Sequence, residues 1–310
     1  MRRDSALFKM RLPATSANLG SGFDTAAVAL DFHLEVEAEA APELSISATG
    51  KDSDLCSRRE DNLILNVYRR TLEENGRPVP PIAIRMCNNI PLGMGCGSSA
   101  AGRLAALALA VHFGELGWAP DRILEEASTL EGHPDNVAAC WLGGFVATAK
   151  DGQALCVARV DPPSAWRAVV VLPSVSLATS KARAVLPASY SRADVVANLQ
   201  AVSVLGLAFA QDRGDLLRVA MQDRIHQPYR AELCPLLPRL LPLAGKAGIL
   251  GVALSGAGPA VLIIVESERE VARATEEILN AVMDLPRPQL LVCRFETAGA
   301  CNSLRDGNFR

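Results

Sequence analysis

The chain has 310 residues, 49% of them hydrophobic and 21% charged, and a formal net charge of -3. This composition is ordinary for a globular protein, so it excludes a disordered chain, a collagen and a coiled coil. The near-neutral charge, without a cluster of Lys and Arg, argues against a nucleic-acid partner, and the length favours two lobes of roughly 100–200 residues each.

The first half of the chain mixes strand and helix patterns in irregular order. Apolar or alternating runs predict strands at 8–12, 32–40, 82–87 and 145–149. Apolar residues at helical spacing predict helices at 62–74, 99–116 and 120–130. Asn75-Gly76 is a helix stop, and Pro120 suits the first position of a helix.

The same patterns continue through the second half. They predict strands at 168–172, 249–254, 260–265 and 289–294, and helices at 193–211 and 268–283. The helix at 193–211 is nearly uncharged, so we expect it to be buried on most sides. Ser267 followed by Glu270 predicts a capping box at the start of the last helix. Because regular β-α-β alternation is missing, the predicted fold class is α+β.

The sequence favours a cytoplasmic protein that does not enter a membrane. The eight cysteines are scattered without a C-x-x-C pair, which predicts free thiols in a reducing compartment rather than disulfides or a zinc site. The segment 1–10 is basic but lacks the apolar run of a signal peptide. The uncharged segment 247–265 is nearly long enough to cross a bilayer, but its glycines and Pro259 favour two strands joined by a turn.

The strongest functional signal is the segment 91–101, Pro-Leu-Gly-Met-Gly-Cys-Gly-Ser-Ser-Ala-Ala. Three glycines at spacing two allow a close backbone approach, and the helix start that follows suits a phosphate. The segment is not a Walker loop, because it has no lysine, and it lacks the β-α-β context of a dinucleotide fingerprint. A plain connecting loop is the alternative, which three glycines and two cap-type serines make weaker.

Two further turns rich in small residues lie at 18–24 and at 255–259, where a plain hairpin is the simpler interpretation. The segments 13–24, 91–101, 131–136 (Glu-Gly-His-Pro-Asp-Asn) and 254–259 together resemble the motifs of the GHMP kinases. The first and third are similar to those of the homoserine kinase branch of that family. Ser21 stands where the family usually has Pro, Cys96 where it usually has Leu, and Thr25-Ala-Ala where a segment usually carries Leu-Gly. The motifs keep the family's order over nearly the whole chain.

The resemblance implies ATP-dependent phosphorylation of L-homoserine by a two-lobed α+β enzyme of the cytoplasm, commonly a homodimer. Pro162-Pro163 is the expected boundary between an N-terminal lobe (1–163) and a C-terminal lobe (164–310). The resemblance assigns ATP to Asn62, Pro91, Leu92, Gly93, Met94, Gly95, Cys96, Gly97, Ser98, Ser99, Ala100, Ala101, Ser255 and Gly256. For Asn62, the cap of a helix is an equally good interpretation.

By the same resemblance, Ser99 and Glu131 would hold Mg²⁺, a hard cation suited to hydroxyl and carboxylate oxygens. Glu125 and Glu126, on the same predicted helix as Glu131, remain alternative ligands. A solvated carboxylate at a helix end is the simpler interpretation of Glu131 without the family match.

The resemblance also implies a substrate side. The substrate contacts would be Asn18, Asp24, Asn136, Thr179, Arg183 and Arg230, and the catalytic group would comprise His133, Asp135, Asn136 and Arg183. Two arginines suit a carboxylate, because the guanidinium fork binds it through two hydrogen bonds. Related kinases often carry an aspartate at the position of Asn136, and an amide does not accept the proton of a hydroxyl. We therefore expect phosphoryl transfer without a dedicated base, with Asp135 and His133 as the alternative bases.

Two other functions stay open on the sequence alone. Another GHMP kinase of small molecules, of the mevalonate or diphosphocytidyl-methylerythritol type, commonly has an aspartate where this chain has Asn136. A non-catalytic binding protein on the same fold is the second, and the intact loop at 91–101 together with Glu131 counts against it.

Overall fold

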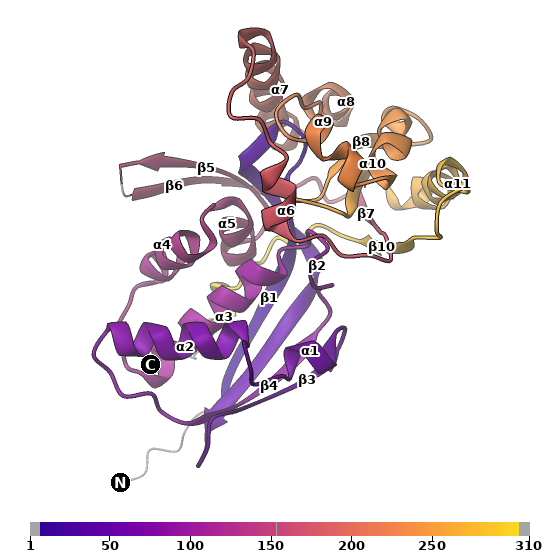
Figure 1. The fold of residues 1–310 in the computed structure, drawn as a ribbon. Coiled ribbons are helices and arrows are strands. Elements are labelled where there is room, and N and C mark those ends of the chain that lie inside the picture. Colours follow the sequence, from indigo (N-terminus) through magenta and orange to yellow (C-terminus); the bar gives the residue numbers. More distant parts are fainter. Residues whose placement is uncertain (1–6, 153, 304–310) are drawn as a thin grey trace.

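Two β-sheets, one from each half of the chain, organise the fold and confirm the predicted α+β class (Figure 1). The structure is a computed structural model that describes residues 7–152 and 154–303. Within these residues the first sheet has the order β3-β4-β2-β5-β6 with β1 paired to β2, and the second has the order β10-β7-β9-β8. The strands are β1 (Phe8–Asn18), β2 (Gly22–Ala40), β3 (Ser45–Gly50), β4 (Ile82–Asn88), β5 (Phe145–Asp151), β6 (Ala154–Val160), β7 (Arg167–Leu172), β8 (Ile249–Leu254), β9 (Val261–Val265) and β10 (Gln289–Cys293).

A long antiparallel hairpin of β1 and β2 forms the spine of the first sheet. Both strands exceed their predicted lengths, because β1 continues to Asn18 and β2 already starts at Gly22. Asn18 has a φ of 70°, a left-handed conformation that Asn tolerates better than most residues. At the tip, Ser21 Oγ donates a hydrogen bond to the carbonyl of Ala220 at 2.6 Å. The hairpin therefore carries Asn18 and Asp24 against the second lobe.

The helices of the first lobe pack on one face of its sheet (Figure 1). They are α1 (Ser53–Cys56), α2 (Leu63–Glu74), α3 (Ser98–Phe113), α4 (Pro120–Glu131) and α5 (Asp135–Leu142). Helix α3 contacts β1 and lies between α2 and α4, and its small Ala-rich side chains allow neighbours to approach it closely. Part of the opposite face of the sheet is exposed, with ion pairs such as Lys9–Glu37 at 2.6 Å.

Both faces of the second sheet are covered. The helices of this lobe are α6 (Thr179–Ala184), α7 (Arg192–Ala210), α8 (Leu217–Ala220), α9 (Gln227–Arg230), α10 (Leu236–Leu240) and α11 (Val271–Ala281). Ile263 of β9 packs in one hydrophobic cluster with α10 and α11, whereas its neighbour Leu262 packs in the core shared with the first lobe. Burial on both sides explains why the uncharged segment 247–265 forms two strands rather than a long apolar helix.

The prediction that segment 193–211 is buried on most sides is wrong. Helix α7 packs on the core through Leu205 and Phe209, but Leu199 is 58% exposed and Leu207 is 54% exposed. Among the described helices, α7 is the one long and apolar enough to cross a membrane by length and composition. Few charged residues mark the solvent-facing side of α7, and part of that side is apolar, so the sequence pattern suggests more burial than the helix has.

The predicted capping box at Ser267 is also wrong. The Ser267 side chain makes no capping hydrogen bond, and residues Glu268–Glu270 form a single 3₁₀ turn before α11 begins at Val271. The N–H of Glu270 donates to the Ser267 carbonyl at 3.1 Å, so the backbone already satisfies the donor that a serine cap would bind.

The last described segment returns to the first sheet. The N–H of Glu296 donates to Ala29 O at 3.0 Å, and the N–H of Asp31 donates to Arg294 O at 3.0 Å. These bonds fill the stretch of β2 where its neighbour changes from β5 to β4. Pro162-Pro163 does lie in the connection between β6 and β7, but the division into 1–163 and 164–310 stays a prediction.

Candidate active site

The glycine-rich loop connects β4 to the start of α3. Gly93, Gly95 and Gly97 all have positive φ angles, of 66°, 80° and 72°. A Cβ at Gly97 would lie 1.9 Å from Thr15 Oγ1, and one at Gly95 would lie 2.1 Å from the Ser255 carbonyl oxygen. Only glycine fits these positions. Gly97 caps α3 without a side-chain hydrogen bond, so the first N–H groups of the helix are open to an anion.

A carboxylate faces the serine at the start of α3. Glu131 ends α4, and its Oε1 accepts a hydrogen bond from Ser99 Oγ at 2.5 Å, while its Oε2 pairs with the Arg103 guanidinium. A hydroxyl and a carboxylate oxygen are donor types that Mg²⁺ prefers, so this pair fits the ion. Of the rival carboxylates, Glu125 is exposed and Glu126 lines a separate cavity beside α2.

Arg103 is a site residue that the sequence analysis does not find. It lies one helical turn after Ser99, so both side chains project from the same face of α3. A single cation four residues after the loop serine, in an otherwise apolar helix, is the signal that points to it.

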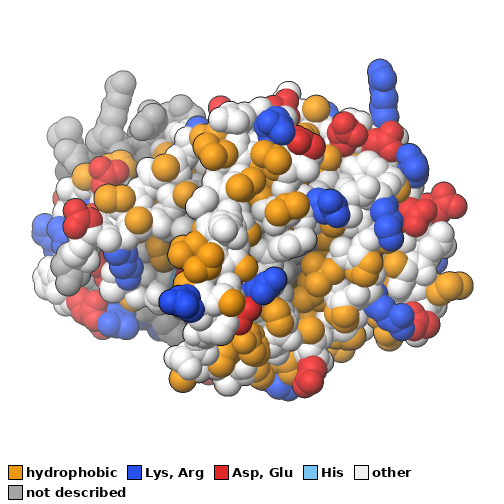
Figure 2. Space-filling model, turned by 90° about the horizontal axis from the view of Figure 1, so that it is seen from above, with side chains coloured by type: hydrophobic (Ala, Val, Ile, Leu, Met, Phe, Trp, Pro, Cys, Tyr) orange, Lys and Arg blue, Asp and Glu red, His pale blue; other side chains and the backbone are white. Residues whose placement is uncertain are grey.

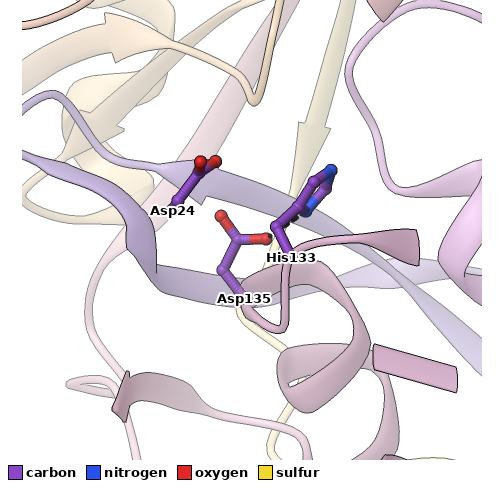
Figure 3. Close-up of side chains that lie close together, drawn as sticks. All are labelled: Asp24, His133 and Asp135. Carbon is purple, nitrogen blue, oxygen red and sulfur yellow. Dashed lines mark hydrogen bonds and ion pairs between the residues drawn. The ribbon is translucent and has the colours of Figure 1, made fainter. Parts of the chain in front are cut away.

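His133, Asp135 and Asn136 lie together at the start of α5. Asp135 Oδ1 accepts a hydrogen bond from the His133 ring at 2.9 Å and one from the Asn136 N–H at 2.6 Å. Burial acts to lower the pKa of His133, but the hydrogen bond to Asp135 and the charges of Asp135 and Glu131 outweigh it, so the pKa is raised. The Asp24 carboxylate faces Asp135 from the tip of the β1–β2 hairpin (Figure 3).

Arg183 and Asp24 form an ion pair that joins the two lobes. The guanidinium of Arg183 binds both carboxylate oxygens of Asp24, at 3.0 and 2.7 Å. The two residues are 159 positions apart, and Arg183 comes from α6. The hydrogen bond to Asp24 raises the pKa of Arg183. Arg183 and Asp24 are thus brought together, as substrate-side residues should be, but they already neutralise each other.

Arg230 is 1% exposed and forms no ion pair among the described residues. It donates to neutral acceptors, the Ala182 carbonyl at 3.0 Å and the His226 ring at 3.1 Å, and its guanidinium lies 5.4 Å from the centre of the Phe23 ring. Burial lowers the pKa of Arg230, and the nearby charge of Arg183 lowers it further. The charges of Asp24 and Asp223 act in the opposite direction, but neither carboxylate pairs directly with Arg230. A buried cation without a direct ion-pair partner among the described residues favours an anionic ligand.

His226 and Phe23, which support Arg230, are absent from the predicted site. The His226 ring donates to Gly20 O at 2.8 Å and accepts from Arg230, so it is neutral, and its ring stacks on Phe23 at 5.1 Å. Burial lowers the pKa of His226. Asn18 is also engaged, because its amide donates to Gly256 O at 2.7 Å and accepts from the Asp24 N–H at 2.9 Å.

Most of these residues line one cavity of about 180 Å³, whereas Arg103, Phe23 and His226 lie outside its lining. Its lining combines the loop, the α5 start and both arginines: Asn18, Asp24, Gly93, Gly95, Cys96, Gly97, Ser98, Ser99, Glu131, His133, Asp135, Asn136, Leu177, Thr179, Arg183, Arg230, Gly256 and Ala257. A second cavity, of about 280 Å³, shares Ser98 with it and is lined largely by apolar residues, together with Asn62 and Leu92.

Several predicted ATP residues face elsewhere. Ala100, Ala101 and Ser255 are fully buried, and Pro91 and Met94 line neither cavity. Ser255 Oγ donates to the Gly95 carbonyl at 2.7 Å, so it supports the loop from the buried side, away from the cavity. Asn62 caps α2, because its Oδ1 accepts from the N–H groups of Ile64 and Leu65.

Comparison with known proteins identifies similar sequences. The family model "GHMP kinases N terminal domain" matches residues 62–144, and "GHMP kinases C terminal" matches residues 207–285. A curated homoserine kinase of Solibacter usitatus is 42% identical over 282 residues, covering 90% of this chain and 92% of its own length. That of Moorella thermoacetica is 41% identical, covering 82% of this chain and 86% of its own length.

Solved structures agree on the fold. The crystal structure of homoserine kinase from Cytophaga hutchinsonii has a TM-score of 0.81 at 26% identity, covering 96% of this chain and 98% of its own. Mevalonate kinase of L. major has a TM-score of 0.72 at 14% identity, covering 96% of this chain and 98% of its own, which shows a shared fold alone.

Proposed function

The chain belongs to the GHMP kinase family, and from this we propose that it transfers the γ-phosphoryl group of ATP to the side-chain hydroxyl of L-homoserine. It is an enzyme, a homoserine kinase, whose product O-phospho-L-homoserine leads toward threonine. The observation that carries this conclusion is identity of 37–42% with curated homoserine kinases over most of the chain. The enzyme is soluble, and we place it in the cytoplasm.

One panel of substrates tests the proposal. ATP consumption should depend on L-homoserine and should not be stimulated by mevalonate or a diphosphocytidyl alcohol. Turnover of mevalonate in place of homoserine would favour another GHMP kinase, and the absence of turnover with every alcohol would favour a binding protein.

The phosphates of ATP would lie on the loop at 93–99, and the adenine in the apolar cavity next to Ser98. Mg²⁺ would be held by Ser99 and Glu131, and when bound it neutralises charge on the phosphates. Arg103 keeps the Glu131 carboxylate turned toward Ser99 through its ion pair on the other oxygen.

The amino-acid head group would exchange with the Asp24–Arg183 ion pair. The substrate ammonium replaces Arg183 beside Asp24 and Asn18, and the substrate carboxylate binds Arg183 and Arg230. The pocket then keeps its charge balance, and Arg230 gains the anion that it lacks. L-Threonine, which has the same head group, should compete with homoserine. Thr179, at the start of α6, lines the same cavity.

The chemical step joins the substrate hydroxyl oxygen to the γ-phosphorus and breaks the bond from that phosphorus to the bridging oxygen of ADP. We propose that no protein base is needed, because the loose transition state requires little deprotonation of the hydroxyl. The hydroxyl proton passes to an oxygen of the transferred phosphoryl group. Asn136 orients the substrate hydroxyl. Asp135 supports Asn136 through a hydrogen bond, and His133 in turn binds Asp135.

This mechanism predicts modest effects at the alternative bases. A true general base is worth about 10²–10⁴-fold in rate. Asp135→Asn and His133→Gln should each lose less than that in kcat at saturating substrate, measured by a coupled ADP assay. Asn136→Ala should lower kcat by misaligning the hydroxyl. A fall of about 10³-fold in Asp135→Asn with unchanged KM and a lost acidic limb in the pH profile would make Asp135 the base instead.

We also propose that the enzyme is a homodimer that uses the outer face of α7. The face of the molecule drawn in Figure 2 exposes many apolar side chains with charged ones dispersed among them. Val196, Leu199 and Leu207 are 45%, 58% and 54% exposed, and their spacing aligns them along one side of the helix.

A charge on this face should separate the dimer. Leu199→Glu should shift the mass in light scattering from dimer to monomer at micromolar protein, because a carboxylate buried against apolar side chains is costly. Met283→Glu, at an exposed apolar residue beyond α11, is the matched control and should remain dimeric. A monomeric wild-type protein would contradict the proposed homodimer. A dimeric Leu199→Glu variant would show that the interface does not include this side of α7.

A further inference from the structure

Thr15 is a buried residue of β1 that joins the phosphate loop to the start of α5. Its side chain is 0% exposed, and its Oγ1 lies 2.6 Å from Asn136 Oδ1. Its N–H donates to the Cys96 carbonyl at 3.1 Å, and Gly97 approaches so closely that a Cβ there would overlap the hydroxyl. Thr15 therefore contacts the loop and Asn136 at once, although it does not line the cavity itself.

The neighbours of Asn136 fix which way its amide points. Asp135 Oδ1 lies 3.3 Å from one end of the amide, and a carboxylate only accepts hydrogen bonds, so that end must be the nitrogen. The oxygen must then face Thr15, whose hydroxyl donates to it. The distance of 2.6 Å agrees with an O–H donor, since N–H···O bonds are usually about 2.9 Å.

We propose that Thr15 is a positioning residue that locks Asn136 with its amide nitrogen, as a donor, toward the reacting hydroxyl of the substrate. The inference rests on the proposed function. Asn136 lines the cavity, and its nitrogen carries a second hydrogen that Asp135 does not use. A hydroxyl oxygen has two lone pairs. When Asn136 donates to one of them, the other is directed to the γ-phosphorus, and the hydroxyl proton points away from Asn136.

The hydrogen bond to Asn136 also explains why a threonine suits position 15. Valine has nearly the same shape as threonine but no hydroxyl, so it would leave the Asn136 oxygen unpaired beside the loop. Only the longer contact of 3.3 Å to Asp135 would then hold the amide, so it could rotate and its nitrogen would no longer be directed at the hydroxyl. Serine keeps the hydroxyl and loses only a methyl group.

A double-mutant cycle tests the inference in the full-length enzyme. Thr15→Val should lower kcat for L-homoserine at least tenfold with little change in KM for ATP, and Thr15→Ser, the matched control, should restore most of kcat. In an Asn136→Ala background, Thr15→Val should change kcat by less than about twofold, because it acts through the amide. Thermal melting of each variant verifies folding, and a destabilised Thr15→Val would still be judged by the cycle.

Three results would overturn the inference. They are wild-type kcat in Thr15→Val, failure of Thr15→Ser to restore more activity than Thr15→Val, and effects of Thr15→Val and Asn136→Ala that multiply in the double variant. A wild-type enzyme that does not phosphorylate L-homoserine would instead contradict the proposed function, so the two failures are distinguishable.

Discussion

Arg230→Met should lower kcat/KM for L-homoserine by about 30-fold or more, because leaving the partner of a buried charge unpaired costs about 2–5 kcal/mol. Arg230 is buried and forms no ion pair within the described part of the chain, so the substrate carboxylate would be its counter-charge. KM for ATP should stay near the wild-type value. Steady-state kinetics with each substrate varied in turn measures both quantities, kcat/KM for L-homoserine and KM for ATP. Thermal melting tells a loss of binding from a loss of the fold.

Two controls test whether Arg230 acts through the substrate carboxylate. Arg213→Met removes an exposed arginine that pairs with Asp215 on the surface, and it should leave the kinetics unchanged. The decarboxylated analogue 3-aminopropan-1-ol should be a poor substrate of the wild type but should lose no further activity in Arg230→Met. If that analogue loses as much activity as homoserine, Arg230 does not bind the carboxylate.

Glu131→Gln should reduce kcat by about 10²–10³-fold, the usual cost of removing one group that stabilises transition-state charge. Glutamine keeps the shape of the side chain and an acceptor for Ser99, but it lacks the negative charge that a cation needs. The Mg²⁺ concentration for half-maximal rate should rise, and Ser99→Ala should share this shift. Titration with Mn²⁺ in the presence of a non-hydrolysable ATP analogue gives a direct binding measurement.

The same helix offers the matched control for Glu131. Glu126→Gln and Glu125→Gln change carboxylates that lie outside the cavity, and both should keep the wild-type Mg²⁺ dependence. A loss in Glu126→Gln that matches or exceeds the loss in Glu131→Gln would move the metal site to Glu126.

The parts of the site that the sequence predicts are the ones that are local in the chain. Glycines at spacing two before a serine and a helix predict the glycine-rich loop and the start of α3, since turn and helix start are set by neighbouring residues. The segment 131–136 likewise places a carboxylate, a histidine and an amide within one turn. The ion pair of Asp24 with Arg183 follows from no local rule, because 159 residues separate the partners.

The errors have physical reasons as well. Thr15 lies in β1, and the residues that it contacts at the site, Cys96 and Asn136, are distant in the sequence, so no local pattern predicts the role of its hydroxyl. For α7, hydrophobicity alone does not tell a buried side from an exposed apolar one. At Ser267 the capping pattern is present, but a 3₁₀ turn satisfies the same backbone donor first.

The return of the C-terminal segment to β2 has a consequence for biosynthesis. Residues 294–296 exchange hydrogen bonds with Ala29 and Asp31, which are synthesised long before them. N-terminal units usually fold first as a chain is made. Here the first sheet cannot finish pairing until residues 294–296 have been synthesised, so a chain that stops before them leaves a stretch of β2 unpaired. An unpaired strand edge of that kind is a template for aggregation, so we expect chains that lack residues 294–296 to aggregate more readily than the full-length chain.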